Sequence, residues 1–142
     1  LHRQPPHRRD PQPHVMSPLA RYEAMVREGQ LGAWALTLAV EGIVAALIAR
    51  AFGVEPSRAA RAAVAGSLLT HPFVWWAHFQ LIFDHGYWTT LALVECIAVF
   101  GEAPFYRLAG ATWPRALAMS LLVNASSVLA GLSPYLSRLL AA

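Results

Sequence analysis

The chain has 142 residues, of which 56% are hydrophobic and only 13% are charged, whereas an ordinary soluble domain has roughly 45–50% apolar and about 25% charged residues. So little charge cannot cover the surface of a water-soluble fold, and the composition therefore favours a protein embedded in a lipid bilayer. The net charge of +3 comes from arginine alone, because the chain contains no lysine. No basic face with interleaved aromatic residues lies outside the apolar segments, so nucleic acid is not expected as a partner.

The first thirty residues differ in composition from the rest of the chain. Residues 1–16 are rich in Pro, Arg and His and have no periodicity, so we expect a tail that is disordered or bound to a partner, with Met16 as the natural start of the protein. No apolar core of signal-peptide length precedes Leu31, and the first span is therefore expected to direct insertion. Residues 17–30 predict a short amphipathic helix that lies at the membrane interface.

Four apolar stretches follow within residues 31–140, and each is close to the roughly 20 residues that cross ~30 Å of hydrocarbon. The predicted spans cover residues 31–50, 62–83, 87–108 and 115–136. Their short connections force neighbouring helices to run antiparallel. The sequence therefore predicts an all-α integral membrane protein, built as an antiparallel four-helix transmembrane bundle.

Local signals mark the connections between these spans. Ser57 is a suitable N-cap for the second span, and residues 84–86, with the sequence Asp-His-Gly, predict a tight turn. The single cysteine, Cys96, lies in an apolar stretch, has no partner for an internal disulfide, and is expected to be a small core residue.

The arginines near the span ends predict an orientation. The first loop holds Arg50, Arg58 and Arg61, the third is flanked by Arg107 and Arg115, and the second has none. Because positive residues are retained on the cytoplasmic side, loops one and three are expected there, with both termini outside. We expect a multi-pass protein of the bacterial inner membrane.

Six polar side chains interrupt the predicted spans. An ionisable group at mid-bilayer costs roughly 2.5–3.5 kcal/mol on insertion scales, so each needs a partner, a proton or access to water. The six residues are Glu41, His71, His78, Glu95, Glu102 and Asn124.

Their spacing predicts how they pair. His71 and His78 are seven residues apart, as are Glu95 and Glu102, so each pair shares a helix face with its members about 10 Å apart along the axis. In an antiparallel hairpin that turns at residues 86–87, His78 lies level with Glu95 and His71 with Glu102. The sequence therefore predicts two His–Glu pairs.

The same arithmetic about the other turns predicts two layers of polar residues. The first consists of Glu41, His71, Glu102 and Asn124 at mid-membrane, and the second of His78 and Glu95 nearer the outside. Pro72 is expected to kink the second span and to free the Leu68 carbonyl, to which Thr70 is positioned to donate.

Three interpretations of these layers remain open. In the first, His–Glu and Glu–Asn hydrogen bonds only fix the helix register. In the second, carboxylates and imidazoles at successive depths form a proton or cation path. In the third, Glu41, His71 and Glu102 bind zinc, iron or manganese; no metal is predicted, however, because the Glu-x-x-His spacing of di-iron bundles is absent.

The arrangement of an early glutamate, a Thr-His-Pro in the second span, two glutamates in the third and an Asn-Ala-Ser-Ser in the fourth is similar to that of small four-span bacterial membrane proteins. This resemblance implies no activity. No phosphate loop, nucleophile elbow or HExxH motif occurs, and Ser120, Ser126 and Ser127 have no evident base and are expected to bond their own helix.

The leading functional hypothesis is a small non-catalytic accessory subunit of a larger bacterial inner-membrane complex of respiratory or photosynthetic type. Its expected partners are the lipid bilayer and other membrane protein subunits. No cofactor is predicted, although His71 or His78 is a possible axial ligand for haem or chlorophyll. The alternatives are a small proton- or cation-coupled transporter, which would use the mid-membrane layer, and an intramembrane enzyme that modifies lipid.

Overall fold

The computed structural model describes the backbone of residues 18–140 and the side chains of residues 30–133. The expected tail over residues 1–16 and the apolar face expected for residues 17–29 lie outside the described side chains. Over the described residues the chain is all-helical, which confirms the all-α prediction. The elements are α1 (Pro18–Ile48), the short 3-10 helix η1 (Ala49–Phe52), α2 (Pro56–Leu108) and α3 (Trp113–Leu140).

The first helix, α1, is continuous from Pro18 to Ile48. It therefore joins the segment expected as a separate interfacial helix over residues 17–30 to the predicted first span. The physical reason is that no proline or turn sequence follows Pro18 within these residues, and an isolated glycine such as Gly32 costs only about 1 kcal/mol in a helix interior. The helix continues as η1 and ends at Gly53, which is left-handed with φ 74°.

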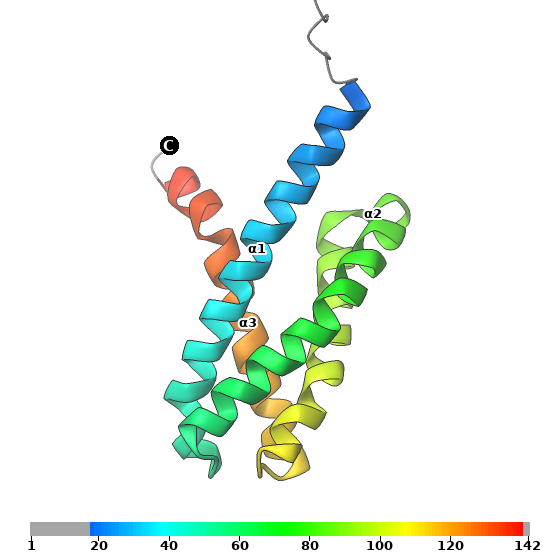
Figure 1. The fold of residues 1–142 in the computed structure, drawn as a ribbon. Coiled ribbons are helices and arrows are strands. Elements are labelled where there is room, and N and C mark those ends of the chain that lie inside the picture. The colour runs from blue at the N-terminus through cyan, green and yellow to red at the C-terminus, as the bar shows by residue number, and fades with distance from the viewer. Residues whose placement is uncertain (1–17, 141–142) are drawn as a thin grey trace, which may run out of the picture.

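The longest element, α2, folds back on itself at Gly86 (Figure 1). Gly86 has φ 71° and ψ 168°, a combination open almost only to glycine. The expected turn at residues 84–86 thus divides α2 into a first arm (residues 56–85) and a second arm (residues 87–108). The structure consequently has three α-helices among residues 18–140, one of them bent double, where the sequence predicted four separate ones.

The start of α2 corrects one expectation. The N-cap is Glu55, not Ser57: its carboxylate accepts hydrogen bonds from the backbone N–H groups of Ser57 at 3.0 Å and Arg58 at 2.9 Å. Pro56 occupies the first turn, where its missing N–H costs nothing. The helix therefore begins well before residue 62. The hydroxyl of Ser57, followed by the two N–H groups, lowers the pKa of Glu55 to about 2.

Pro72 does not interrupt α2. Gly86 is the one residue of this helix with non-helical backbone angles, so the helix continues through Pro72, and the kink expected there stays a prediction. The hydroxyl of Thr70, whose single proton serves one acceptor at a time, lies 3.1 Å from the Gly66 carbonyl and is not bonded to that of Leu68. This is the usual bond of a helical threonine to the carbonyl four residues earlier.

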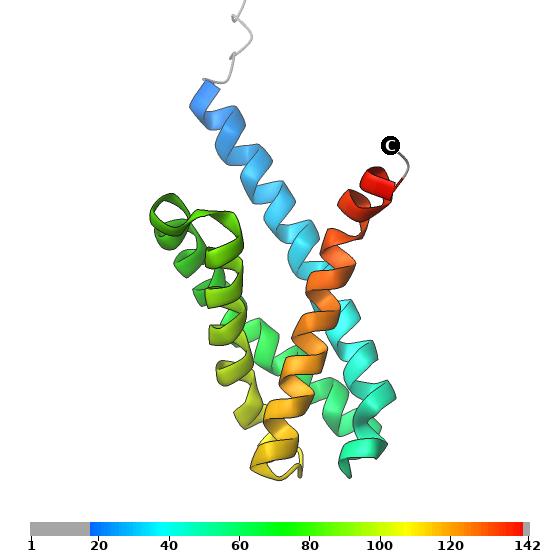
Figure 2. The same cartoon turned by 180° about the vertical axis from the view of Figure 1, so that it is seen from behind.

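The helices meet at one end of the molecule and spread apart at the other (Figures 1 and 2). We call the first the arginine end, because it holds η1, the α2–α3 connection and all five arginines of residues 30–133. The other is the Gly86 end. Here the turn of α2 stands apart from α1 and α3, so the bundle is open.

The apolar core lies towards the arginine end, where small side chains let all three helices approach closely. It is built mostly from alanines, with one large aromatic side chain. The core residues are Ala45, Ala49, Val54, Ala59, Ala62, Ala63, Tyr106, Ala111, Ala116, Met119 and Val123. At the same end Arg115 donates to the Phe52 carbonyl at 3.4 Å, which links the two loops.

Two segments are long and apolar enough to cross a membrane, Gln30–Phe52 and Trp113–Ser133. Little of either is buried inside the molecule, 11% and 28% of the apolar window respectively. They therefore differ from the core helices of soluble proteins, which hide their apolar surface. Large apolar side chains are also exposed elsewhere, among them Leu108 at 85% and Phe83 at 89%.

Candidate functional site: a buried carboxylate cluster

Four polar side chains from three helices meet in the interior just above the apolar core. Glu41 comes from α1, Ser67 and Glu102 from the two arms of α2, and Asn124 from α3. They are 1%, 1%, 2% and 4% exposed respectively. Together with Thr70 and Ser127, which bond to them, we call these residues the carboxylate cluster.

Glu41 accepts hydrogen bonds from two serines on different helices. The hydroxyl of Ser67 donates to Oε2 of Glu41, and that of Ser127 lies 3.0 Å from Oε1. The Ser127 hydroxyl also lies 2.9 Å from the Asn124 carbonyl, so its single proton serves one acceptor at a time. Glu41 thereby ties α1 to α2 and to α3.

Glu102 is surrounded by donors in the same way. The amide of Asn124 donates to Oε2 at 2.9 Å, and the Thr70 hydroxyl lies 2.9 Å from Oε1. Ser67 lies at 3.4 Å from that same oxygen. Each carboxyl group is therefore held by side chains of at least two helices, and the predicted first layer converges for Glu41, Glu102 and Asn124.

The hydroxyl of Ser67 lies between the two acids. It has one proton to donate and lies within hydrogen-bond distance of both acids, of Oε2 of Glu41 and, at 3.4 Å, of Oε1 of Glu102. A proton on Glu102 would be donated to Ser67, and the Ser67 proton to Glu41, so one added proton completes a carboxyl–hydroxyl–carboxylate chain. The geometry is therefore suited to hold a proton and to pass it between the two acids.

Two glycines allow the arms of α2 to approach each other closely at this site. A Cβ atom at Gly66 would lie 3.1 Å from Cγ of Glu102, and one at Gly101 would lie 2.9 Å from Cγ2 of Thr70. Each glycine thus faces a cluster residue on the opposite arm. The absence of both side chains brings the Thr70 hydroxyl within reach of Glu102.

Among residues 30–133, neither buried acid contacts a basic side chain, since all their hydrogen-bond partners are hydroxyl or amide groups. An ionised carboxylate without a counter-charge is costly in an apolar interior, by several kcal/mol. Such a group is neutralised by a proton or by a bound cation. The oxygen donors around Glu41 and Glu102 are ligands of the kind that hard cations prefer.

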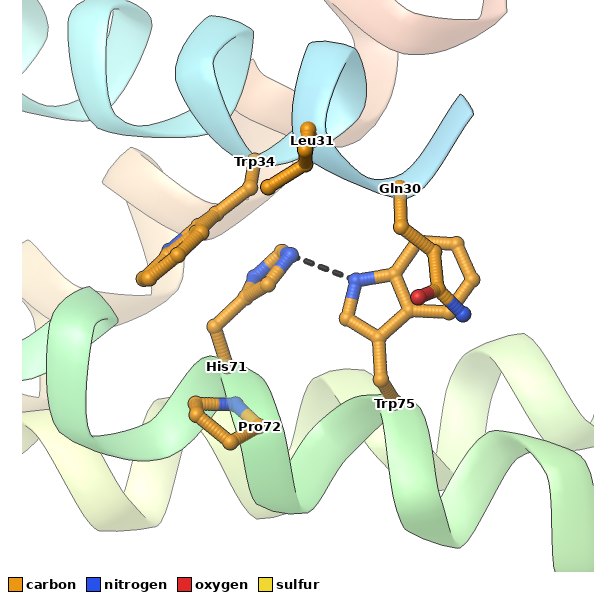
Figure 3. Close-up of a pocket in the computed structure, with 6 residues that line it drawn as sticks. All are labelled: Gln30, Leu31, Trp34, His71, Pro72 and Trp75. Carbon is orange, nitrogen blue, oxygen red and sulfur yellow. Dashed lines mark hydrogen bonds between the residues drawn. The ribbon is translucent and has the colours of Figure 1, made fainter. Parts of the chain in front are cut away.

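The imidazole of His71 does not bond to Glu102, which corrects the predicted pair. Its Nε2 accepts the indole N–H of Trp75 at 2.5 Å, and its ring stacks on Trp34 with centroids 5.7 Å apart and an angle of 10° (Figure 3). Trp75 lies one helical turn away on the same arm, so this contact forms without any help from the second arm. These rings, with Gln30, line a cavity of about 270 Å³.

His78 and Glu95 also form no hydrogen bond, so the second predicted pair is wrong in this respect. His78 packs edge-on against Phe79 and Tyr87. Both His78 and Glu95 line a cavity of about 280 Å³ between the helices. Equal depth along the two arms therefore did not bring the imidazole and the carboxyl group into a bond, because the ring of His78 packs against aromatic neighbours instead.

The metal hypothesis for Glu41, His71 and Glu102 finds no support. Within the described part of the chain, no three side chains of His, Cys, Asp or Glu are placed to hold a metal ion together. With Nε2 engaged by Trp75, His71 cannot present that atom to haem or chlorophyll. His71 does contribute to the wall of a small cavity of about 50 Å³ beside the carboxylate cluster.

Sequence reasoning missed Ser67 in the cluster and misread two other serines. Ser127 was expected to bond only its own helix, and Ser120 likewise, whereas Ser120 donates across to the Val99 carbonyl on α2 at 3.0 Å. Ser126 does follow the expectation, with a bond of 2.8 Å to the Leu122 carbonyl. The position of Ser67 in the sequence could have indicated its role, because it lies one helical turn before His71, on the face that carries the other polar residues.

Comparison of the chain with known protein families, with curated proteins and with solved structures finds no match.

Proposed function

We propose that this chain is a small multi-pass membrane protein that takes up a proton or a small cation at the carboxylate cluster, as part of proton- or cation-coupled transport. The observation that carries the proposal is the pair of buried acids, Glu41 and Glu102, which share Ser67 and have no basic partner among the described residues. A group of this kind is stable only when a positive charge joins it.

The proposed membrane position follows from the surface. We infer that both arms of α2 cross the bilayer together with α1 and α3, because the outward faces carry large apolar side chains from all three helices, such as Leu47, Phe73 and Leu129. The arginine end then faces the cytoplasm, since positive residues are retained there. The described ends of α1 and α3, at Pro18 and Leu140, then lie on the opposite side.

A flux assay in liposomes tests this function. Purified protein is reconstituted with a pH-sensitive dye inside, an inward proton gradient is applied with and without Na⁺ or K⁺, and uptake is compared with protein-free vesicles. We expect uptake by the wild type and at least a tenfold loss in Glu41→Gln and Glu102→Gln. Each variant keeps the length of the side chain and an oxygen acceptor but loses the acid.

The matched control is Asp84→Asn, which removes an exposed acid at the turn of α2 and should lower uptake far less than either cluster variant. Folding of each variant is checked by its thermal midpoint in detergent. Wild-type uptake no faster than that of empty vesicles, or full uptake by the folded Glu41→Gln/Glu102→Gln double variant, would contradict the proposal.

A second candidate is the accessory subunit of a larger inner-membrane complex. The observation in its favour is a row of exposed aromatic side chains along the first arm of α2, formed by Phe73, Trp76, Phe79 and Phe83. Aromatic residues are enriched where proteins contact one another. In this case the buried cluster serves only to fix the helix register.

Native purification in mild detergent distinguishes the two candidates. An accessory subunit migrates with a defined partner at fixed stoichiometry. If the aromatic row forms the contact, the double variant Trp76→Ala/Phe83→Ala should no longer migrate with the partner, whereas Glu102→Gln should still do so. Migration of the chain alone, together with flux in liposomes, excludes the accessory function.

A further inference from the structure

The cavities of the molecule are distributed unevenly around the carboxylate cluster. Three of them adjoin one another towards the Gly86 end, with volumes of about 280, 220 and 50 Å³. Thr37 and Glu95 line all three, and Tyr87 lines the two larger ones. The smallest also contacts Glu41 and Glu102, so the series leads from the open end to the cluster.

The opposite side of the cluster is closed. One turn beyond Glu41 towards the arginine end lies Ala45, and one turn beyond Glu102 lies Tyr106; both are fully buried, as are Ala63 and Met119. These side chains belong to the apolar core that joins all three helices. Cavities therefore adjoin the cluster on the side of the Gly86 end, and the packed apolar core lies on its other side.

The charged side chains are also distributed unequally between the two ends. Five exposed arginines surround the arginine end, namely Arg50, Arg58, Arg61, Arg107 and Arg115, and they repel cations. The turn at the Gly86 end carries Asp84. Among the side chains of residues 30–133, the arginines are thus concentrated at the closed end, and an acid stands at the open one.

Glu95 is the first acid along this route. It is partly exposed, lines each of the three cavities and accepts no hydrogen bond from the described side chains. The titratable groups that line these three cavities with it are His71, His78, Tyr87 and Glu102 on α2 and Glu41 on α1. The part of α3 that faces it contributes Ser127, which is not titratable at physiological pH.

We infer that small cations and protons reach the carboxylate cluster from the Gly86 end only, and that Glu95 is the positioning residue that attracts them into this route. The biological role of this route rests on the proposed function, but the route itself is a property of the fold. Access to the cluster can therefore be measured whether or not the protein transports ions.

Cysteine labelling tests the route. In a Cys96→Ser background, Thr37→Cys places a thiol in the cavities, Ala45→Cys places one two turns away in the closed core, and Leu36→Cys places one on the outer apolar surface. A membrane-impermeant, positively charged methanethiosulfonate is added to one face of vesicles, and His85→Cys, at the exposed turn, reports which face is the Gly86 end.

We expect Thr37→Cys to be labelled only from the face that labels His85→Cys, and at least tenfold faster than Ala45→Cys or Leu36→Cys. Labelling of Thr37→Cys from the other face, or no difference among the three positions, would overturn one-sided access.

The role of Glu95 is measured by charge selectivity. The ratio of labelling rates for a positively and a negatively charged methanethiosulfonate at Thr37→Cys should fall about tenfold in Glu95→Gln, in the range known for electrostatic steering. Glu95→Asp should restore it, and Asp84→Asn should have a smaller effect. An unchanged ratio in Glu95→Gln overturns this role. One-sided labelling without proton flux would leave the route intact and remove the proposed function.

Discussion

The side-chain amide of Asn124 on α3 donates a hydrogen bond of 2.9 Å to Oε2 of Glu102 on the second arm of α2. The same amide nitrogen lies 2.9 Å from the Ser120 carbonyl on its own helix. Since an amide has two N–H groups, both acceptors are served at once. Asn124 is therefore oriented by α3 to hold an acid on α2, and this contact bears on stability as well as on the proposed function.

Asn124→Ala should lower the free energy of unfolding by about 1–2 kcal/mol, because it leaves Oε2 of a buried carboxyl group without its donor. The measurement is unfolding of the purified protein in mixed detergent micelles, followed by circular dichroism. Ser126→Ala is the matched control on the same helix: Ser126 bonds only to the Leu122 carbonyl, so its loss should change stability little. Equal effects of the two variants would show that the Asn124 bond contributes nothing specific.

Gly101→Ala should destabilise the fold by about 1–3 kcal/mol, because the added Cβ would lie 2.9 Å from Cγ2 of Thr70 and force the arms of α2 apart. Gly131→Ala, on α3, meets no atom within 4 Å and should be neutral or stabilising by up to about 1 kcal/mol through helix propensity. Thermal midpoints of both variants in detergent provide the test. Equal stability of Gly101→Ala and Gly131→Ala would show that the two arms do not pack closely at Gly101.

Gly86→Ala should cost about 1–3 kcal/mol for a different reason. No atom lies within 4 Å of the added Cβ, but the backbone has φ 71° and ψ 168°, which alanine adopts only with strain. Gly32→Ala, in the regular helix α1 and equally free of contacts, is the control and should not destabilise. Chemical unfolding of the pair separates backbone strain from steric conflict, and a stable Gly86→Ala protein would exclude the tight turn.

The cap of α2 should make stability depend on pH. The pKa of Glu55 falls from its ordinary value of 4.5 to about 2 in the folded protein, chiefly through the Ser57 hydroxyl. Because the pKa of Glu55 is lower in the folded state, the cap contributes fully to the free energy of unfolding above about pH 4.5. This contribution to stability is lost as the pH falls towards 2. We therefore expect the wild type to lose more stability than Glu55→Gln between pH 5 and pH 2.

This comparison is made with thermal midpoints at several pH values. Asp84→Asn should follow the wild-type curve, because Asp84 accepts no cap hydrogen bonds from the described residues. Parallel curves for the wild type and Glu55→Gln would show that the carboxylate of Glu55 does not cap the helix.

The sequence predicted the helical class of the protein and the identity of its buried acids from local information. Long apolar stretches with few charges indicate helices, and an acid inside such a stretch needs a partner wherever the helix packs. For this reason Glu41, Glu102 and Asn124 could be named together from their depth alone. The turn at residues 84–86 followed from the glycine, whose freedom of conformation is a property of the residue itself.

The pairing of the histidines was decided by tertiary structure. Equal depth is a one-dimensional measure, and it does not report how far apart two helices lie or which way their faces turn. Where Gly66 and Gly101 let the arms of α2 touch, Glu102 is reached by Thr70 and Ser67. Nearer the turn at Gly86, His78 packs against Phe79 and Tyr87, and His78 and Glu95 line one cavity without bonding to each other. His71, at the boundary between the two regions, bonds to Trp75 on its own arm.

The sequence by itself therefore determined which segments are helical and which acids must be neutralised, since both follow from the chemistry of single residues and their near neighbours. Only the tertiary structure decided that Ser67 lies between Glu41 and Glu102, that no imidazole of residues 30–133 bonds to them, and that a small cavity adjoins the cluster. These properties depend on the distances between the helices. The small residues at the contacts set those distances, and the spacing of residues along the chain does not reveal them.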